Sequence, residues 1–110
     1  MPLSEKARIE VYLPDLPGRA YRELLDALSR EFTYTFGGCS ILQGLAGSYL
    51  SQRGLLMEDR VNVVYTDAPF SLAANEQALS QYVDELRQAA YVALEEEAIL
   101  VALLRVYHPA

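Results

Sequence analysis

The order of strand-like and helix-like hydrophobic patterns along the sequence constrains the fold of this chain more than any other feature. Apolar residues alternate with polar ones in strand-like segments, and they recur at spacings of three and four in helix-like segments. The predicted order is strand, helix, strand, strand, helix, strand, over residues 7–13, 19–32, 39–50, 55–66, 72–93 and 98–107. We therefore expect an α+β fold, the ferredoxin-like βαββαβ sandwich, in which two helices cover one face of a four-stranded antiparallel sheet.

Turn-forming residues mark where these segments end. Residues 14–18 contain two prolines and a glycine, and residues 51–54 form a short polar turn between the two middle strands. Residues 33–36 have the composition of a strand, and the pair Gly37 and Gly38 interrupts that strand before Cys39. The pattern thus predicts that the first helix ends at Phe32 and that a bent strand entry follows it.

Length and composition favour one folded domain, residues 1–110. Hydrophobic residues make up 52% of the sequence, which excludes a disordered or low-complexity chain. The net charge is −6, and eight of the nine basic residues are scattered arginines, so this acidic chain is not expected to bind nucleic acid or an anionic membrane. The sequence shows neither a secretory signal nor an apolar run long enough to span a membrane, and a cytoplasmic location is expected.

Four stretches carry a family resemblance: the helix that ends in Phe32, and residues 37–44, 54–58 and 61–65. In this arrangement the chain resembles uncharacterised small ferredoxin-like proteins and the dimeric α+β barrel group. The resemblance implies the strand order 4-1-3-2, with the first and third strands in the centre. It does not imply one chemistry, because this fold hosts monooxygenases, isomerases, metal-tolerance proteins and nucleotide sensors.

The last strand predicts that the chain assembles with itself. Its residues are apolar at both parities, as Val101 and Leu103 show for one side and Leu100 and Leu104 for the other. Two helices can cover only one face of the sheet, so the second face needs another cover. We expect a homo-oligomer, and specifically a homodimer.

The first strand predicts a polar sheet face. Its apolar residues must face the helices, so its polar residues emerge together on the opposite face. By parity, the third and last strands are expected to add polar residues to the same face. The predicted ligand-binding residues are Arg8, Glu10, Tyr12, Arg60, Asn62, Arg105 and Tyr107.

Two interpretations of this polar face remain open. Its three arginines, Arg8, Arg60 and Arg105, can act as fixed donors in a chamber for a small anionic or aromatic ligand, closed by a second subunit. In that case Glu10 is expected near Arg105 across the strands. Alternatively, the face is solvated or covered by a subunit, and its charges only pair with each other.

The remaining reactive side chains are expected to have structural roles. His108 is the only histidine, and because it lies near the end of the sequence it is expected to lack a partner. Cys39 has no local Cys-His pattern and is expected in the core. Gly44 and Gly47 favour a β-bulge, since no phosphate-binding glycine motif occurs. We predict no catalytic residue, no metal and no cofactor.

The sequence therefore favours an oligomeric small-ligand-binding or regulatory module over an enzyme. The alternative is a cofactor-independent isomerase or monooxygenase of the dimeric α+β barrel kind, which would need a closed pocket. A trimeric nucleotide sensor is a third possibility, but such a protein is expected to carry a longer loop than residues 51–54 provide.

Overall fold

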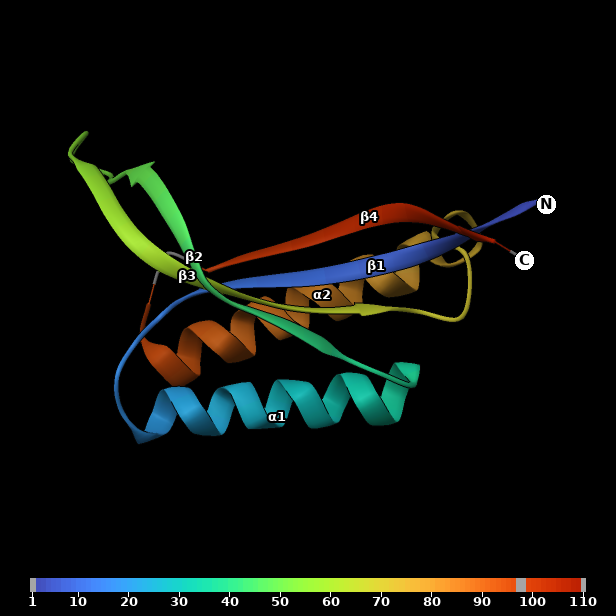
Figure 1. Cartoon of the computed structure of the whole chain (residues 1–110), viewed down its shortest axis with the longest axis horizontal. Helices are drawn as coiled ribbons and strands as arrows, with labels where there is room; N and C mark the ends of the chain where they lie inside the picture. Colours follow the sequence, from blue (N-terminus) through green and yellow to red (C-terminus); the bar gives the residue numbers. More distant parts are fainter. Residues whose placement is uncertain (1, 97–98, 110) are drawn as a thin grey trace.

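A computed structural model describes residues 2–96 and 99–109 and confirms the predicted α+β fold. The chain forms one sheet with strand order β2-β3-β1-β4, in which every neighbouring pair is antiparallel (Figure 1). This is the predicted order. The elements in sequence are β1 (Leu3–Pro14), α1 (Arg19–Phe36), β2 (Ser40–Leu50), β3 (Leu56–Asp67), α2 (Leu72–Leu94) and β4 (Leu100–Pro109).

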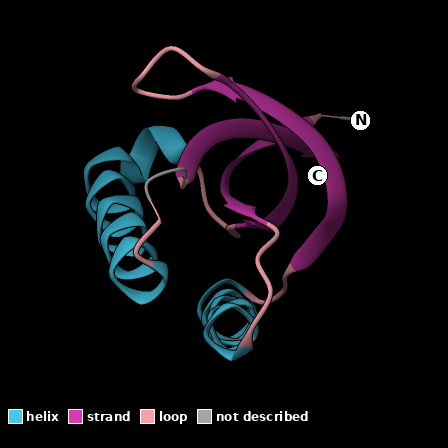
Figure 2. Ribbon diagram, turned by 90° about the vertical axis from the view of Figure 1, so that its left-hand side faces the viewer, coloured by secondary structure: helices cyan, strands magenta, loops and turns pink. Residues whose placement is uncertain are grey.

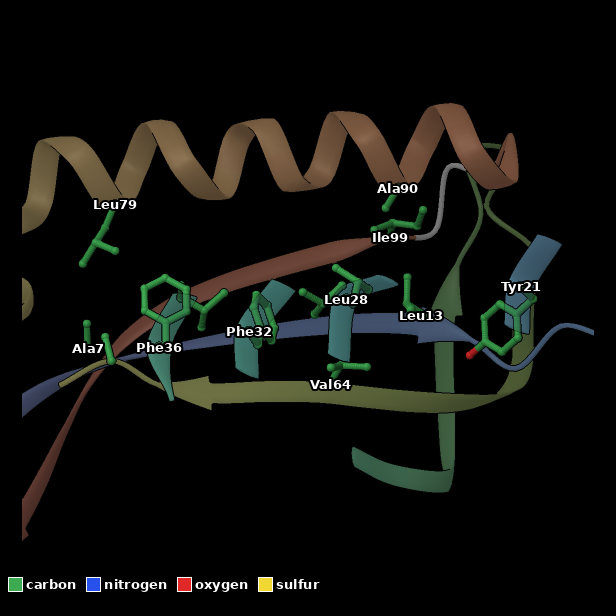
Figure 3. Packing of buried hydrophobic residues seen from close by; sticks show 13 residues of the cluster. Ala7, Leu13, Tyr21, Leu28, Phe32, Phe36, Val64, Leu79, Ala90 and Ile99 are labelled. Carbon is green, nitrogen blue, oxygen red and sulfur yellow. The ribbon is translucent and has the colours of Figure 1, made fainter. Parts of the chain in front are cut away.

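Both helices lie on one side of the curved sheet, as Figure 2 shows. The central strand β1 turns its apolar residues toward them, and Ala7, Ile9, Val11 and Leu13 are completely buried, as predicted. Phe32 of α1 packs against this layer, and α2 adds Leu79 and Ala90 to the same core (Figure 3). Burial of this alternating row fixes which face of β1 meets the helices.

Helix α1 continues four residues beyond its expected end, so the strand entry predicted for residues 33–36 is wrong. Phe36 follows Phe32 at helical spacing and is buried against Tyr82 of α2, with ring centroids 5.5 Å apart. The helix stops at Gly37, whose φ of 98° lies in the left-handed region and whose N–H donates to the carbonyl of Thr33. Aromatic packing here outweighs the β-propensity of the threonines.

The other predicted elements are confirmed within a few residues. Helix α2 begins after Ser71, whose hydroxyl accepts a hydrogen bond from the N–H of Ala74. It ends at Leu94, one residue past the predicted end. The predicted start of the last strand, Ala98, lies outside the described residues.

The β2–β3 hairpin extends beyond the helix-covered sheet as a twisted two-stranded projection, seen at the upper left of Figure 1. We call residues 45–61 the arm and the rest of the described chain the body. The arm begins at a register shift between Leu42 and Leu45, where Gly44 has a φ of 71°. This confirms the predicted bulge, and the positive φ explains why a glycine is present there.

A buried amide joins the arm to the body. The side-chain oxygen of Asn62 accepts the N–H of the bulge residue Gly44, and its nitrogen donates to the hydroxyl of Tyr21 on α1 and to Asp15. Asn62 is only 3% exposed. These hydrogen bonds hold the bulge, and with it the root of the arm, against α1.

Candidate functional site

The structure places part of the predicted site on the sheet face away from the helices, which we call the open face. Arg8, Glu10 and Tyr12 lie there, as predicted, because they alternate with the buried residues of β1. Asn62 pairs with Leu13 in the register and therefore points to the helix side instead. Arg60 shares the parity of Asn62, so its predicted place beside Arg8 is also wrong.

The predicted placement of Arg105 and Tyr107 on the open face is wrong as well. Their register partners are Ala7 and Glu5, which belong to the helix-side parity of β1. Arg105 pairs with Glu5 at 3.2 Å, and not with Glu10, whose register partner is Ala102. A charged residue can stand on the helix side here because Arg105 remains exposed to solvent.

One end of the open face carries an ion-pair cluster formed by Arg8, Asp67, His108 and Tyr65, which we call the Asp67 cluster. The guanidinium of Arg8 donates two hydrogen bonds to Asp67, at 2.6 and 3.0 Å, and lies 4.7 Å from the ring centre of Tyr65. The Nε2 atom of His108 lies 2.9 Å from Oδ2 of the same carboxylate. The expectation that His108 lacks a partner is therefore wrong.

Electrostatics stabilise the charged forms of Arg8 and Asp67. The hydrogen bonds from Arg8 lower the pKa of Asp67, although partial burial of the carboxyl opposes the shift, and His108 adds to the lowering. The pKa of Arg8 is raised in turn, chiefly by its hydrogen bonds to Asp67. The guanidinium thus has an anionic partner within its own chain.

The predicted anion chamber does not form, because its three arginines are separated. Arg8 is neutralised by Asp67 on the open face, and Arg105 by Glu5 on the helix side. Arg60 belongs to the arm, where its side chain lies near the bulge residue Gly44. Of the seven predicted ligand-binding residues, only Arg8, Glu10 and Tyr12 lie on the open face.

A groove lies at the other end of the open face, where the arm rises from the sheet. Its volume is about 440 Å³, and its lining comes from the end of β1, the start of β4 and both strands of the arm. We call it the groove. It is lined by Tyr12, Pro14, Gly47, Ser48, Tyr49, Leu50, Ser51, Gln52, Asp59, Val61, Ile99 and Leu100.

Tyr12 connects the groove with the predicted polar face. Its hydroxyl donates a 2.7 Å hydrogen bond to Glu10, the neighbouring residue on the same face of β1. This hydrogen bond, with smaller contributions from burial and from the charge of Glu10, raises the pKa of the phenol. Tyr12 therefore stays protonated at physiological pH, and its oxygen can still accept a hydrogen bond from a ligand.

The groove is open to solvent, since Leu50, Leu100 and Tyr49 in its walls are exposed by 70%, 58% and 40%. The closed pocket that the enzyme alternative needs is thus not formed by the described residues of one chain. A larger depression of about 840 Å³ lies around Arg60, but only residues of β2 and β3 line it. Within residues 2–96 and 99–109, no group of three His, Cys, Asp or Glu side chains could hold a metal ion.

Sequence reasoning missed the arm residues of the groove, among them Tyr49 and Asp59. Strand parity gives the face of a residue, but it does not say that the arm forms a groove with the start of β4. The signal available in the sequence was Gly47, a glycine inside a predicted strand. In the structure Gly47 lies opposite Asp59 in the register, and a Cβ atom on Gly47 would come within 2.8 Å of Val61. Cys39, by contrast, packs against the core as expected.

The arm also carries a dense group of exposed apolar side chains. Among the described residues, six of the fourteen exposed large hydrophobic side chains lie in the arm, and Ile41 and Leu42 lie just before it. The largest exposed fractions there are those of Leu50, Leu56 and Leu55. A projecting hairpin with this surface is unusual for a chain that stays monomeric in water.

Comparison with known proteins bears on the fold alone. The sequence matches no protein-family model and no curated protein. Among solved structures, the chain is similar to CutA1 from Oryza sativa, with a TM-score of 0.60 at 14% identity over 96% of this chain and 84% of that one. A divalent cation tolerance protein, CutA1 from Thermus thermophilus, gives a TM-score of 0.56 at 16% identity over 92% and 82%.

A third similar structure is CPII, a nitrogen regulatory PII-like protein from Thiomonas intermedia K12, bound to ADP, AMP and bicarbonate. Its TM-score is 0.57 at 15% identity, over 99% of this chain and 100% of that one. The three similarities confirm a small ferredoxin-like α+β fold. In the described part of the chain, moreover, no helix is both long enough and apolar enough to cross a membrane.

Proposed function

We propose that this acidic protein is a homo-oligomeric, small-ligand-binding module of the cytoplasm, and that the groove is its ligand site. The observation that carries the proposal is the groove itself: a concave, mainly apolar site with a few polar groups, formed where arm and body meet. The free thiol of Cys39 is compatible with a reducing compartment.

The exposed arm supports the homo-oligomer. The apolar residues of the arm, together with Leu100 on the open face, leave a surface that the two helices do not cover. A second copy of the chain would bury this surface and would close the groove from its solvent side. We expect a homodimer, as the uncovered sheet face suggested.

The structural neighbours support a binding role for a fold of this kind. CPII was solved with two nucleotides and bicarbonate bound, and one CutA1 protein is described by divalent cation tolerance. A ligand-binding or regulatory role is therefore within the range of this fold. The ligand of the present chain must be derived from its own groove.

A thermal-shift screen tests the ligand site. Metabolites, nucleotides and divalent metals are screened for a rise in Tm, because a ligand that binds only the native state stabilises it by mass action. We expect hits to lose their effect in Tyr49→Ala, which removes a wall of the groove, and to keep it in Tyr34→Ala, an exposed tyrosine on α1. Hits that respond equally in both variants would place the ligand elsewhere.

Light scattering tests the assembly. The native chain is expected to give an oligomer mass at micromolar concentration, and the double variant Leu55→Ser with Leu56→Ser to shift toward the monomer. Val92→Ser, which changes an equally exposed residue of α2, is the control and should leave the mass unchanged. A native chain that is monomeric would overturn the oligomer.

A further inference from the structure

We propose that the groove selects an organic cation, a ligand with an apolar body and an ammonium group, rather than a nucleotide or another anion. This inference rests on the groove being the ligand site, as proposed above. It follows from three properties of the lining: its apolar floor, its two tyrosines and its one carboxylate.

The apolar residues set the body of the ligand. Val61 and Ile99 form part of the lining together with Pro14, Leu50 and Leu100. A volume of about 440 Å³ is within the range of small-molecule sites. A ligand with one aromatic ring or a short hydrocarbon chain would remove water from these side chains, and the hydrophobic effect favours this contact.

Two tyrosines, Tyr12 and Tyr49, offer partners for a positive charge. These residues line the groove from β1 and from the arm, and the face of an aromatic ring attracts an ammonium group. The hydroxyl of Tyr12 already donates its proton to Glu10, so toward a ligand its oxygen can only accept. Tyr12 therefore favours a ligand that donates a hydrogen bond.

Asp59 supplies the negative charge. It faces Gly47 across the arm, so no side chain of that register partner covers it. Its Oδ1 atom accepts a hydrogen bond from the backbone N–H of Arg60, and no ion pair within the described residues involves it. A ligand ammonium would provide the charged hydrogen-bond partner that the carboxylate lacks.

Among the described residues, no lysine or arginine belongs to the lining. Arg60 lines the neighbouring depression together with Asp59 but is not part of the groove lining. Arg8 is bound to Asp67 at the far end of the open face. Arg53 is the nearest other cation along the chain, in the turn at the tip of the arm. A phosphate or carboxylate in the groove would thus meet the carboxylate of Asp59 without a matching cation in the lining.

Three probes of similar size test this selection by isothermal titration calorimetry. Phenethylamine is a cation at neutral pH, phenethyl alcohol is neutral and phenylpropanoate is an anion. We expect the amine to bind about tenfold more tightly than either of the others, because it adds a cation–π contact and a charged hydrogen bond. The advantage of the amine should shrink as salt is raised.

Asp59→Asn is the decisive variant. It should weaken binding of the amine by about tenfold and leave binding of the alcohol unchanged, since the two probes differ in charge. Asp84→Asn, an exposed carboxylate on α2, is the matched control and should change neither affinity. Both variants alter exposed side chains, and equal Tm values would show that both are folded.

The outcomes separate this inference from the function on which it rests. If amine and alcohol bind equally and Tyr49→Ala weakens both, the groove is the ligand site but does not select a cation. If the anion binds as tightly as the amine, or if the preference for the amine survives Asp59→Asn, the selection is refuted. If none of the probes binds, the selection is also refuted. The wider thermal-shift screen then decides whether the groove binds any ligand.

Discussion

The body and the arm of this protein use the same kinds of residues for opposite purposes. In the body, the alternating apolar residues from Ala7 to Leu13 are fully buried, and α1 and α2 complete their packing. In the arm, leucines such as Leu50 and Leu56 are mostly exposed although they lie in regular strand structure. Folding of a single chain therefore explains the sequence of the body but not that of the arm.

From this contrast we expect the body to determine the stability of the fold and the arm to determine assembly and ligand binding. Substitutions in the body should act on the free energy of unfolding, because its residues pack against each other. Substitutions of exposed residues in the arm should act on assembly and ligand binding, because these side chains are not buried within the chain. Four substitutions can break or confirm this division, beginning with the one of largest effect.

The largest loss of stability is expected for Phe32→Ala in the core of the body. Phe32 is fully buried, and its removal leaves a cavity between α1 and the sheet. We expect a loss of about 3–5 kcal/mol in the free energy of unfolding, measured by urea denaturation. A loss below about 1 kcal/mol would show that the core is not packed as described.

The next effect concerns the joint between body and arm. Asn62→Ala leaves the N–H of Gly44 and the hydroxyl of Tyr21 without their buried partner, and we expect a loss of about 1–3 kcal/mol. Amide hydrogen exchange should also quicken in the arm, because the bulge is no longer held. Unchanged exchange in the arm would mean that Asn62 supports only the body, and Gln77→Ala on the surface of α2 is the control.

A smaller effect should depend on pH. The pKa of Asp67 is lowered from its ordinary value of 3.8, so its pairing with Arg8 stabilises the fold above that pH and is lost as the pH falls below it. Arg8→Gln should cost about 1 kcal/mol at neutral pH, and the difference from the native chain should vanish in acid. Arg30→Gln, which breaks the exposed pair with Asp26, should show little change at any pH, and equal pH profiles of the two variants would contradict this prediction.

The smallest effect on stability is expected in the arm. Leu55→Ser with Leu56→Ser should change the free energy of unfolding of the monomer by less than about 0.5 kcal/mol, since both side chains are exposed. The measurement must be made at a concentration where light scattering shows the monomer. A loss of unfolding free energy comparable with that of Phe32→Ala would contradict the distinction between body and arm.

Most of the fold could be predicted because its elements carry strong local periods. The alternating row from Ala7 to Leu13 indicated the central strand and its buried face, and the regular spacing from Leu72 onward indicated α2. The end of α1 could not be predicted, because the position of Phe36 depends on Tyr82 and Phe70, which are distant in sequence.

Less of the candidate site could be predicted, because polarity was taken as a sign of exposure. Asn62 and Thr66 are polar yet buried, since Tyr21 and the carbonyl of Gly38 satisfy their hydrogen bonds. Conversely, Arg105 lies at the helix-side parity and is exposed. The alternation of apolar and polar residues in a strand assigns each residue to a sheet face only where one face is buried and the other is exposed along the whole strand.

The pairing of Leu3 with Pro109 makes one edge of the molecule suitable for optical labels. These residues are partners at one end of the β1–β4 ladder, while Tyr12 and Leu100, the last pair at the other end, line the groove. At the usual rise of a strand, the stretch from Leu3 to Tyr12 separates the two ends by roughly 30 Å. A fluorophore beside Leu3 therefore leaves the groove free, and energy transfer to a second dye on the turn of the arm would report whether the arm moves when the groove fills.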